Sequence, residues 1–597
     1  MRLRSFSWGR RRLTVKTNKK PGGVKRIMGY LKKHKVSLFF VFLFAVISTL
    51  FMVAAPTLMG EITTALYDGV TTGTFNWETI VWLLAALVLL YLIAQLFAFL
   101  QHFGMAKVTA KVMQALREDI DRKMHRTKLN YYDTRTNGEI LSVITNDVDT
   151  VNNAISQNLT QIVTQVITAI GILLMMLRIN LWLALIAVVM VPLALISAKG
   201  VMKSSAKHFG KQQELLGQLN GYIEEMYNGQ SVVQVFNYQD RANKDFDALN
   251  EALQKSAQSA EIDSGTIGPI TSLVNNAGYV VSAILGCMFV LSGKMTVGNV
   301  QAMLQYTKQF SQPFTSIAGM AGSFGAASAA AKRIFDLLDA EEEIADPEPG
   351  KLPVSAAGAV EFKHVAFGYT PEKLLMTDVN ISVKPGQKVA IVGPTGAGKT
   401  TLINLLMRFY EIGGGEITVG GVSTKEMTRN ELRSHFGMVL QDTWLFEGTI
   451  RDNLAYSRDG ITDEEIVSAS KSASVDGFIR TLPGGYDMVL TQGAENISQG
   501  ERQLLTIARA MASDPEIMIL DEATSNVDTH TEKTIQDAMV KLMKGRTSFV
   551  IAHRLSTIKD ADMILYMENG DIKEVGNHDT LMAQHGKYEA LYNSQFA

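Results

Sequence analysis

The residue types most suited to chemistry form a glycine-rich pattern near the middle of the second half of the chain. Residues 393 to 400 read GPTGAGKT and fit the pattern G-x-x-x-x-G-K-[ST], directly after the apolar run Val389–Val392. Its backbone N–H groups can surround an anion, Lys399 can reach the outer phosphates of a nucleotide, and the hydroxyl of Thr400 can bind Mg²⁺. The expected phosphate-binding residues are Gly393, Pro394, Thr395, Gly396, Ala397, Gly398, Lys399, Thr400 and Thr401.

Two acidic residues follow a second apolar run. Ile517–Leu520 predicts a buried strand, and Asp521 and Glu522 come directly after it. A carboxylate at the C-terminal end of such a strand lies in the crevice where doubly wound sheets bind ligands. With the phosphate loop nearby, we expect Asp521 to hold Mg²⁺ and Glu522 to act as the general base on the attacking water.

The elements around these motifs predict an α/β fold. Short β-branched runs alternate with helical segments from residue 356 to the end, and an acidic linker that contains proline, residues 336–355, comes before them. The expected strands are Val360–Phe362, Val389–Val392, Met438–Leu440, Ile517–Leu520 and Ser548–Ile551.

The first half of the chain has the pattern of a membrane protein. Six long stretches are free of Asp, Glu, Lys and Arg, except that Lys308 interrupts the last one, and each reaches the ~20 residues that a helical span requires. We therefore expect a six-helix, all-α transmembrane domain over residues 23–335. The stretches are Val36–Gly60, Thr79–Ala106, Thr150–Leu177, Ile179–Ala198, Ser264–Gly293 and Met295–Ala331.

Charge and cysteine content narrow the classes of protein further. Charged residues make up 19% of the chain and apolar residues 47%, against about 25% charged in an average soluble protein. The net charge of −1 excludes a globally basic nucleic-acid binder. Cys287 is the single cysteine of the sequence, so a disulfide framework within the chain and a cysteine-rich zinc site are both excluded.

The distribution of Lys and Arg predicts the orientation. The connections 107–149 and 199–263 carry eight and seven of them, while the other connections carry at most one. This places the N-terminus and both long connections in the cytoplasm. Residues 1–22 form a basic tail, and Gly23–Lys35 could lie along the inner leaflet as an amphipathic helix. An alternative interpretation of the Arg-rich start is a transit peptide.

Polar residues inside two spans could line a path for cargo. In the last span the candidates share one helix face, and a second stripe runs along the third span from Asn153 to Thr168. Such stripes face either a water-filled cavity or a neighbouring helix, and the sequence leaves both open. The candidate cavity residues are Gln301, Gln305, Lys308, Gln309 and Gln312.

A third motif makes a family resemblance specific. Ile497 to Gln503 read ISQGERQ, which resembles the L-S-G-G-Q signature of ATP-binding cassette (ABC) transporters. Other family positions follow in order: an aromatic before the phosphate loop, a Q-loop, a D-loop and a switch histidine. These are Tyr369, Gln441, Ser525-Asn526-Val527-Asp528 and His553. The spans also resemble the type IV exporter fold, so the resemblance covers roughly residues 23–597.

The resemblance implies a role for each of these residues. Tyr369 would stack on adenine, Gln441 would join the Mg²⁺ and water site to the membrane connections, and His553 would contact the γ-phosphate. Ser498 and Gly500 would touch ATP held by a second subunit, so a single copy of each motif implies a dimer. Segments near Tyr132 and Phe236 resemble the coupling helices, which contact the cassette domains.

The signature departs from the family pattern in one half of the site. Gln499 replaces a glycine and Glu501 replaces the usual glutamine, while the phosphate loop, Asp521 and Glu522 are intact. This imbalance resembles one chain of heterodimeric bacterial exporters. We expect a partner that has an intact signature and a defective base.

The function expected from these residues is ATP-driven export of amphipathic or hydrophobic substrates across the cytoplasmic membrane, with ATP and Mg²⁺ as cofactors. The expected partners are a second half-transporter, membrane lipid and a small amphipathic substrate, with no nucleic acid. Two alternatives remain open: an importer on the same fold, for example for siderophores, and an ATP-gated channel or regulator that moves no cargo.

Overall fold

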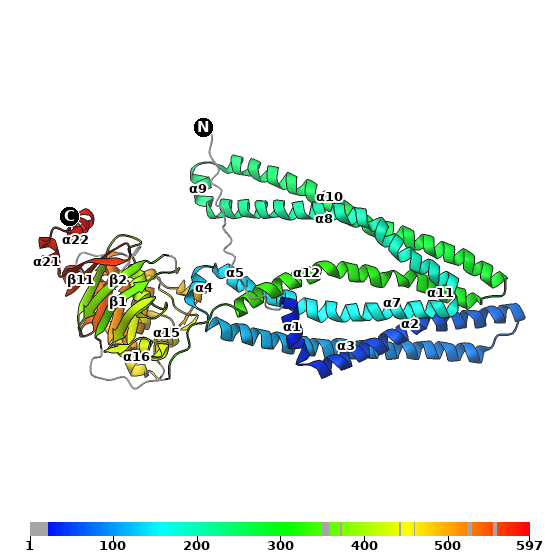
Figure 1. Cartoon of the computed structure of the whole chain (residues 1–597), viewed down its shortest axis with the longest axis horizontal. Coiled ribbons are helices and arrows are strands. Elements are labelled where there is room, and N and C mark those ends of the chain that lie inside the picture. Colours follow the sequence, from blue (N-terminus) through cyan, green and yellow to red (C-terminus); the bar gives the residue numbers. More distant parts are fainter. Residues whose placement is uncertain are drawn as a thin grey trace. The chain divides into compact units, whose positions relative to one another are not determined.

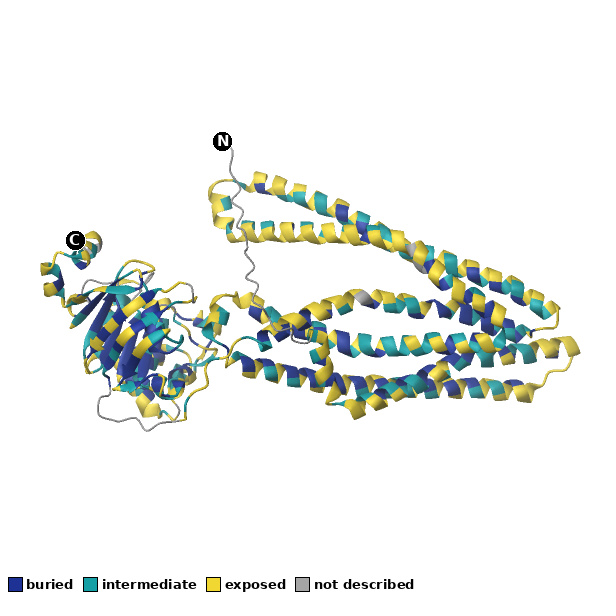
Figure 2. Cartoon of the chain, viewed as in Figure 1, coloured by how far each residue is buried: buried dark blue, intermediate teal, exposed yellow. Residues whose placement is uncertain are grey.

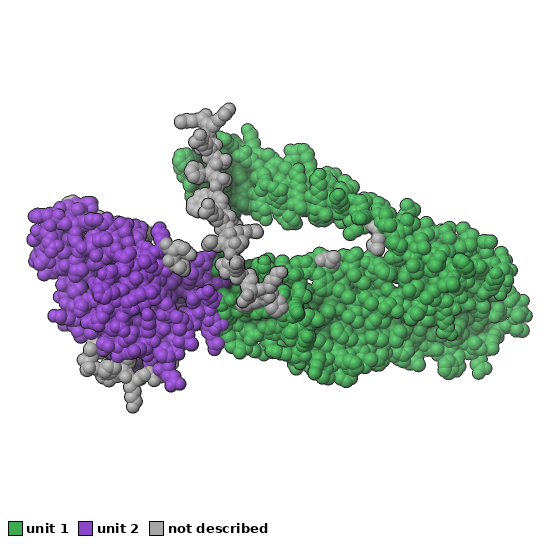
Figure 3. Space-filling view, viewed as in Figure 1, with its two compact units in different colours: residues 1–125, 135–340 green, residues 126–134, 341–597 purple. Residues whose placement is uncertain are grey.

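The computed structural model describes residues 22–348, 358–370, 373–440, 443–458, 460–521, 528–552 and 558–596. The chain divides into two compact units (Figure 3). The first contains residues 1–125 and 135–340, and the second contains residues 126–134 and 341–597. The second unit therefore includes a short piece of the long connection between the second and third predicted spans.

The first unit is all helical (Figure 1). Its long helices run far past the charge-free stretches of the sequence, as the few breakers in the two long connections predict. The elements are α1 (Gly23–Lys32), α2 (Lys35–Thr72), α3 (Trp77–Met124), α5 (Asn137–Ser142), η1 (Val143–Asp147), α6 (Val148–Asn153), η2 (Ala154–Leu159), α7 (Thr160–Ile179), α8 (Leu181–Asn228), α9 (Gln230–Val235), α10 (Gln239–Leu291), α11 (Val297–Phe310) and α12 (Gln312–Leu338).

Five helical segments in the described part of the chain are long and apolar enough to cross a membrane: Lys35–Thr72, Trp77–Met124, Asn137–Ile179, Leu181–Asn228 and Gln239–Leu291. They correspond to the first five predicted spans. The sixth predicted span, Met295–Ala331, is divided into α11 and α12 at Ser311, directly before Pro313. Proline removes a backbone donor and clashes with the preceding turn, which explains a break at this place. A sixth crossing therefore stays a prediction.

Packing in the first unit joins helices that are far apart in the sequence. Tyr306 on α11 is fully buried, and its hydroxyl donates to the carbonyl of Val53 on α2 at 2.6 Å. Arg333 on α12 forms two hydrogen bonds with the buried carboxylate of Asp147, at 2.7 and 2.5 Å. Large apolar residues such as Trp82 are exposed on the long helices. Exposed positions recur along the whole length of these helices (Figure 2). An apolar exterior of this kind is expected where lipid, rather than water, surrounds the helices.

The second unit is built around two sheets. The larger has the order β12-β11-β3-β10-β9-β6 and the smaller, antiparallel one has the order β2-β1-β4-β5. Their strands are β1 (Val360–Phe367), β2 (Met376–Val383), β3 (Lys388–Val392), β4 (Gly414–Val419), β5 (Val422–Ser423), β6 (Phe436–Val439), β9 (Ile517–Asp521), β10 (Thr547–Ile551), β11 (Met563–Glu568) and β12 (Asp571–Gly576). A short pair, β7 (Gly448–Thr449) and β8 (Val489–Leu490), lies apart from both sheets.

Helices complete the second unit. They are α4 (Leu129–Asp133), α13 (Lys399–Leu406), α14 (Arg429–Ser434), α15 (Ile450–Ala455), α16 (Asp463–Ser472), α17 (Asp476–Thr481), α18 (Gln499–Ala512), α19 (Thr529–Met543), α21 (His578–Ala583) and α22 (Lys587–Phe596). All five strands predicted from the sequence are present, with shifted ends.

The central strands of the larger sheet are buried on both faces. Along β3, Val389 and Ile391 belong to one hydrophobic core, whereas Ala390 and Val392 belong to the other. Strands β3, β10, β9 and β6 run parallel, and such strands read as continuous apolar runs because both faces are covered. The continuous apolar runs explain why these strands could be predicted from the sequence. Because the strands run parallel, the loops that follow their C-terminal ends meet at one edge of the sheet.

Candidate functional site

The phosphate loop lies between β3 and α13, as its sequence predicts. Gly393, Gly396 and Gly398 have φ angles of 150°, 81° and 101°, values that side chains disfavour. A Cβ atom on Gly393 would lie 2.2 Å from the carbonyl oxygen of Met567, so only glycine fits there. Helix α13 begins at Lys399, and the N–H groups of its first turn have no acceptor within the helix. The loop thus presents donors to an anion.

Lys399 lies folded over this loop. Its Nζ atom donates to the carbonyl oxygen of Gly393 at 2.6 Å and approaches that of Pro394 at 3.3 Å. Burial lowers the pKa of the Lys399 ammonium, and the negative charge of Asp521 opposes that shift. The lysine is thus positioned at the loop, close enough to the acid that ends β9 to feel its charge.

Strand register places Asp521 at the same edge of the sheet as the phosphate loop. Ile551 on β10 pairs with Asp521 on one side and with Ile391 on the other, and Gly393 follows Ile391 by two residues. Asp521 and the exposed Thr400 offer a carboxylate and a hydroxyl oxygen. Oxygen ligands of this kind suit Mg²⁺, which takes one or two protein ligands and completes its shell with phosphate and water.

Three residues expected to contribute to catalysis, Gln441, Glu522 and His553, lie outside the described residues. Gln441 follows the end of β6 by two residues, Glu522 follows β9 by one, and His553 follows β10 by two. Their positions therefore stay predictions. Of the D-loop, the structure describes Asp528, whose carboxylate caps α19 by accepting from the N–H of Thr531 at 3.0 Å. This hydrogen bond lowers the pKa of Asp528.

Tyr369 lies beside the phosphate loop. Its hydroxyl is 2.8 Å from that of Thr401, at the start of α13. Its ring packs edge-on against Phe367 and Tyr410, with centroids 5.0 and 5.1 Å away, and the side chain is still partly exposed. An aromatic face held rigidly next to a phosphate site is suited to stack on a nucleotide base.

The signature motif begins a helix, and the carboxylate of Glu501, which replaces the usual glutamine, forms a hydrogen bond within the motif. Ser498 is the N-cap of α18, and the carboxylate of Glu501 accepts the N–H of Ser498 at 2.8 Å. Ser498 Oγ in turn accepts the N–H of Glu501 at 3.4 Å, which completes a capping box. Gln499 is exposed and Gly500 is buried. The negative charge of Glu501 therefore lies at the start of α18, on the backbone N–H of Ser498.

The sequence analysis missed Arg509, on the same helix. Its guanidinium donates to the carbonyl oxygen of Asn453 at 2.8 Å, to the side chain of Asn453 at 2.9 Å and to the carbonyl oxygen of Trp444 at 2.9 Å. Burial lowers its pKa. Trp444 lies three residues after Gln441, so Arg509 ties the signature helix to the segment that follows the Q-loop. Nothing in the sequence distinguishes it from a surface arginine of α18.

We expect Arg509→Lys to lower the midpoint of thermal unfolding of the second unit by roughly 5–10 °C. A lysine keeps the charge but cannot reach three acceptors with one planar fork, and each charge-assisted bond contributes about 1.5–3 kcal/mol. Tryptophan fluorescence of the full chain measures the transition. The matched control is Arg480→Lys, whose exposed pair with Asp476 should leave the midpoint within about 2 °C. Equal shifts in both variants would contradict the role of Arg509.

A second missed contact joins α4 to the rest of the second unit. The hydroxyl of Tyr410 donates to the carboxylate of Asp133. Burial and the negative charge of Asp133 raise the pKa of Tyr410, so the hydroxyl keeps its proton at physiological pH. Lys128 adds an ion pair with Glu341 at 2.7 Å. The predicted docking of residues near Tyr132 onto a cytoplasmic domain thus has a concrete contact within this unit, whereas Phe236 belongs to the first unit and is exposed.

We expect Tyr410→Phe to speed hydrogen exchange of the peptide 126–134 by about 10-fold. The change removes one hydrogen bond to a carboxylate, worth about 1.5 kcal/mol, and leaves the ring packing intact. Hydrogen–deuterium exchange with mass spectrometry of the full chain measures it. Tyr227→Phe is the control, because Tyr227 is exposed on α8 and belongs to the other unit. Unchanged exchange in Tyr410→Phe would show that the bond does not hold α4.

The candidate cavity residues lie on two helices. Gln301 is bonded through its side-chain oxygen to the hydroxyl of Thr63 on α2, so it joins helices. Lys308 is exposed, with its ammonium 5.3 Å from the ring centroid of Tyr279. Gln305 and Gln309 are half-buried on α11, and Gln312 is exposed at the start of α12. The break between the two helices thus separates Gln312 from the other four.

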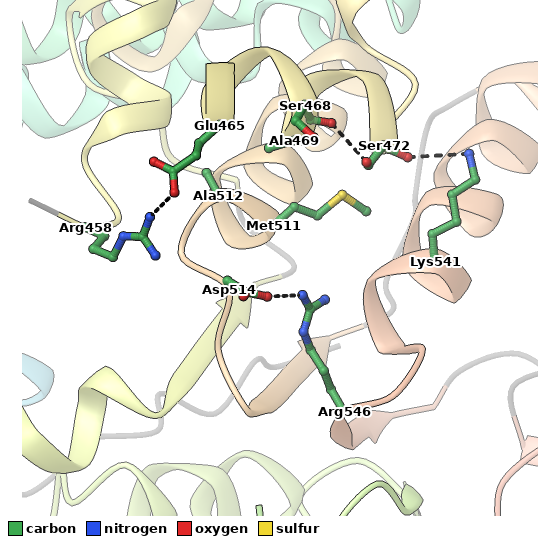
Figure 4. Close-up of a pocket in the computed structure, with 10 residues that line it drawn as sticks. All are labelled: Arg458, Glu465, Ser468, Ala469, Ser472, Met511, Ala512, Asp514, Lys541 and Arg546. Carbon is green, nitrogen blue, oxygen red and sulfur yellow. Dashed lines mark hydrogen bonds and ion pairs between the residues drawn. The ribbon is translucent and has the colours of Figure 1, made fainter. Parts of the chain in front are cut away.

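A polar pocket of about 460 Å³ in the second unit is not part of this site (Figure 4). Arg458 points at Glu465, 2.7 Å away, and Arg546 at Asp514, 2.5 Å away, so two of its three cations are paired with acids. The third, Lys541, approaches oxygen atoms of Ser472 and Ser474. Asp514 lies before β9 and Arg546 lies before β10, so both are near the N-terminal ends of these strands. The phosphate loop follows the C-terminal end of β3, and β3 runs parallel to β10. The pocket is therefore at the opposite edge of the sheet.

Long apolar helices and a phosphate-binding α/β unit in one chain define an ATP-hydrolysing, multipass membrane transporter. Residues 38–314 match the model of the ABC transporter transmembrane region, and residues 376–525 match that of the ABC transporter ATP-binding unit, described as "ABC transporter". The chain belongs to the ABC transporter family.

Relatives and a solved structure agree with this assignment. A "Fatty acid ABC transporter ATP-binding/permease protein" of Mycobacterium tuberculosis is 46% identical over 505 residues, covering 85% of this chain and 80% of that protein. A "Probable multidrug resistance ABC transporter ATP-binding/permease protein" of Bacillus subtilis is 32% identical, covering 84% and 74%. The structure of a bacterial Atm1-family ABC exporter with ATP bound matches with a TM-score of 0.73 and 28% identity, over 94% of this chain and 98% of that one.

Proposed function

We propose that this chain is one half of a dimeric exporter that moves amphipathic or hydrophobic substrates out of the cytoplasm by alternating access. The observation that carries the proposal is the match to an ABC exporter over almost the full length of both chains. The names of two relatives refer to fatty acids and to multidrug resistance, and both kinds of cargo are largely apolar. ATP binding would close two cassettes and open the cavity outward, and hydrolysis would reset it.

The proposed domain boundaries follow from this function. Residues 1–22 are a tail, residues 23–335 form the transmembrane domain with six crossings, residues 336–355 are the linker and residues 356–597 form the cassette. Because ATP is cytoplasmic, the cassette, the N-terminus and both long connections lie on that side of the cytoplasmic membrane. The Lys and Arg distribution supports the same orientation.

The proposed roles at the nucleotide combine the geometry of the described residues with the roles that the family resemblance gives to Gln441, Glu522 and His553. Lys399 leaves the carbonyl of Gly393 to bind the β- and γ-phosphates, and Tyr369 stacks on the base. Thr400, Asp521 and Gln441 hold Mg²⁺, which supplies charge neutralisation at the phosphates when bound. Glu522 takes the proton of the attacking water, and His553 contacts the γ-phosphate.

A heterodimer is supported by the contrast between the two halves of the site in this chain. The capping box places the carboxylate of Glu501 on the Ser498 N–H, and a negative charge there disfavours a phosphate from a partner. The phosphate loop of this chain has no such obstacle. We propose that the ATP bound to Lys399 is hydrolysed and that the ATP facing Ser498 is mainly retained.

Transport in proteoliposomes tests this function against its alternatives. The chain, together with its partner half-transporter, is reconstituted, and a fluorescent fatty acid and a cationic dye are followed with ATP on the cassette side. Export predicts ATP-dependent movement away from that side, which stops in Lys399→Ala. Movement toward it identifies an importer, and passive conductance with ATP bound identifies a channel. ATP turnover without any movement of either probe would argue for a regulator.

A further inference from the structure

A small pocket lies between the start of α2 and the part of α3 where the charge-free stretch ends. Its volume is about 230 Å³, the space of seven or eight water molecules at ~30 Å³ each. Gly104 lets the two helices approach here, since a Cβ atom on it would lie 2.8 Å from Val41 Cγ2. The lining residues are His34, Ser37, Phe40, Val41, Phe44, Gly104, Lys107, Val108 and Lys111.

One end of the pocket is basic. Lys107 and Lys111 are one helical turn apart on α3, so they share a face, and His34 and Ser37 contribute from the start of α2. None of the lining residues is acidic. The Lys107 ammonium lies 5.7 Å from the ring centroid of Phe103, one turn earlier on α3. Within the described part of the chain, neither lysine forms an ion pair, so an anion from outside the protein can still pair with both.

The other end of the pocket is aromatic. The rings of Phe40 and Phe44 lie 6.2 Å apart between centroids, and Phe44 also contacts Phe97 on α3 at 5.6 Å. Val41 and Val108 complete this apolar wall. The pocket therefore suits a ligand with an anionic head and an apolar tail, of which it would hold the head and the first methylene groups.

The depth of the pocket matches the boundary of the membrane. The charge-free stretches Val36–Gly60 and Thr79–Ala106 end beside it, so Lys107 and His34 stand at the level of lipid headgroups. In the proposed orientation this is the inner leaflet, and the inference rests on the proposed function in that respect only. Each lysine close to an anionic leaflet raises the binding constant for that membrane surface roughly five-fold.

Helix α1 fixes this corner of the molecule. Arg26 forms an ion pair with Asp339 at 2.6 Å and lies 4.1 Å from the ring centroid of Phe335, at the end of α12. The hydroxyl of Tyr30 donates to Asp119 on α3 at 2.6 Å. These contacts hold α1 against both helices and leave its lysines exposed: Lys25 and Lys32. The exposed lysines extend the positive field around the pocket.

We propose that the pocket between α2 and α3 is a binding site for an anionic phospholipid of the inner leaflet, whose phosphate is held by Lys107, Lys111 and His34. The phosphate accepts hydrogen bonds from the two ammonium groups, and the first part of an acyl chain lies against Phe40 and Phe44. A fatty acid shares the chemistry of an anionic head on an apolar chain, but its single carboxylate offers fewer oxygens to three donors than a phosphodiester does.

Photo-crosslinking in lipid nanodiscs tests the proposal on the full transporter. A diazirine-labelled phosphatidylglycerol is added at a few per cent to phosphatidylcholine, and labelled peptides are mapped by mass spectrometry. We expect adducts on peptides covering residues 34–44 and 104–111. Lys107→Gln with Lys111→Gln should reduce them about 30-fold, from roughly five-fold for each lysine. Lys107→Arg with Lys111→Arg should retain them.

The matched control is Lys211→Gln with Lys244→Gln, which removes the same charge from exposed positions farther from the predicted spans and should leave the adducts unchanged. Equal labelling by diazirine phosphatidylcholine would overturn the proposal, because the pocket would then hold bulk lipid. Labelling by a diazirine fatty acid but not by phosphatidylglycerol would overturn it too. The readout does not depend on ATP turnover or transport, so failure here and failure of the proposed function can be told apart.

Discussion

Glu522→Gln should stop ATP turnover while ATP still binds. Glutamine has the size of glutamate but cannot accept the proton of the attacking water, and general-base assistance contributes roughly 10²- to 10⁴-fold to a rate. The phosphate loop, Lys399 and Tyr369 are untouched by this change, so affinity for nucleotide should remain within about two-fold. Phosphate release from the reconstituted dimer and binding of a fluorescent ATP analogue measure the two properties separately.

The same variant tests the asymmetry between the two ATP sites. If hydrolysis takes place at the site built on Lys399 and Glu522, the change in this one chain removes nearly all turnover of the heterodimer. Glu464→Gln is the control, since Glu464 is exposed on α16. Turnover at half the original rate would instead mean two equivalent sites, and an unchanged rate would remove Glu522 from the mechanism.

The parts of the fold that the sequence predicted well are those with strong local signals. The glycines of the phosphate loop have the positive φ angles that the motif requires, and β3 and β9 are apolar because they are buried on both faces. Five membrane helices follow from length and the absence of charge. In each case one short window carries enough information to determine the structure.

The parts that escaped prediction depend on contacts between distant residues. In the antiparallel sheet, β1 was predicted but β2, β4 and β5 were not, and their pairing joins segments that are separated in the sequence. Arg509 and Tyr410 look like ordinary surface residues until folding brings Asn453 and Asp133 to them. The position of α4 in the second unit could not be predicted either. A helix of five residues is too short to show a periodicity that indicates which element it packs against.

Glu501 is a position at which the signature motif departs from its family, and the structure shows what its carboxylate contacts. The sequence alone left open whether its carboxylate points toward the signature or away. The capping box directs it onto the Ser498 N–H, so the negative charge lies at the start of α18. A helix N-terminus normally favours an anion, and this one already has its own. This negative charge is the observation behind the proposed imbalance between the two ATP sites.

Lys399→Ala should weaken nucleotide binding by roughly 10- to 100-fold. The ammonium lies over the phosphate loop, 2.6 Å from the Gly393 carbonyl oxygen, where a phosphate held by the loop is within its reach. A charge-assisted hydrogen bond contributes about 1.5–3 kcal/mol, and alanine also removes the positive charge that opposes repulsion from Asp521. Titration of the full transporter with a fluorescent ATP analogue gives the dissociation constant.

Lys399→Arg separates charge from geometry at this position. Arginine keeps the positive charge but presents a planar fork that does not fit the space in which a compact ammonium lies 2.6 Å from the Gly393 oxygen. We expect intermediate affinity and little turnover. Lys388→Ala is the control at the other end of β3, where the backbone N–H of Lys388 donates to the carboxylate of Asp562 and is kept in the variant. If Lys399→Ala binds ATP as tightly as the unaltered chain, the loop does not hold phosphate through this lysine, and the proposed coupling of ATP to transport loses its first step.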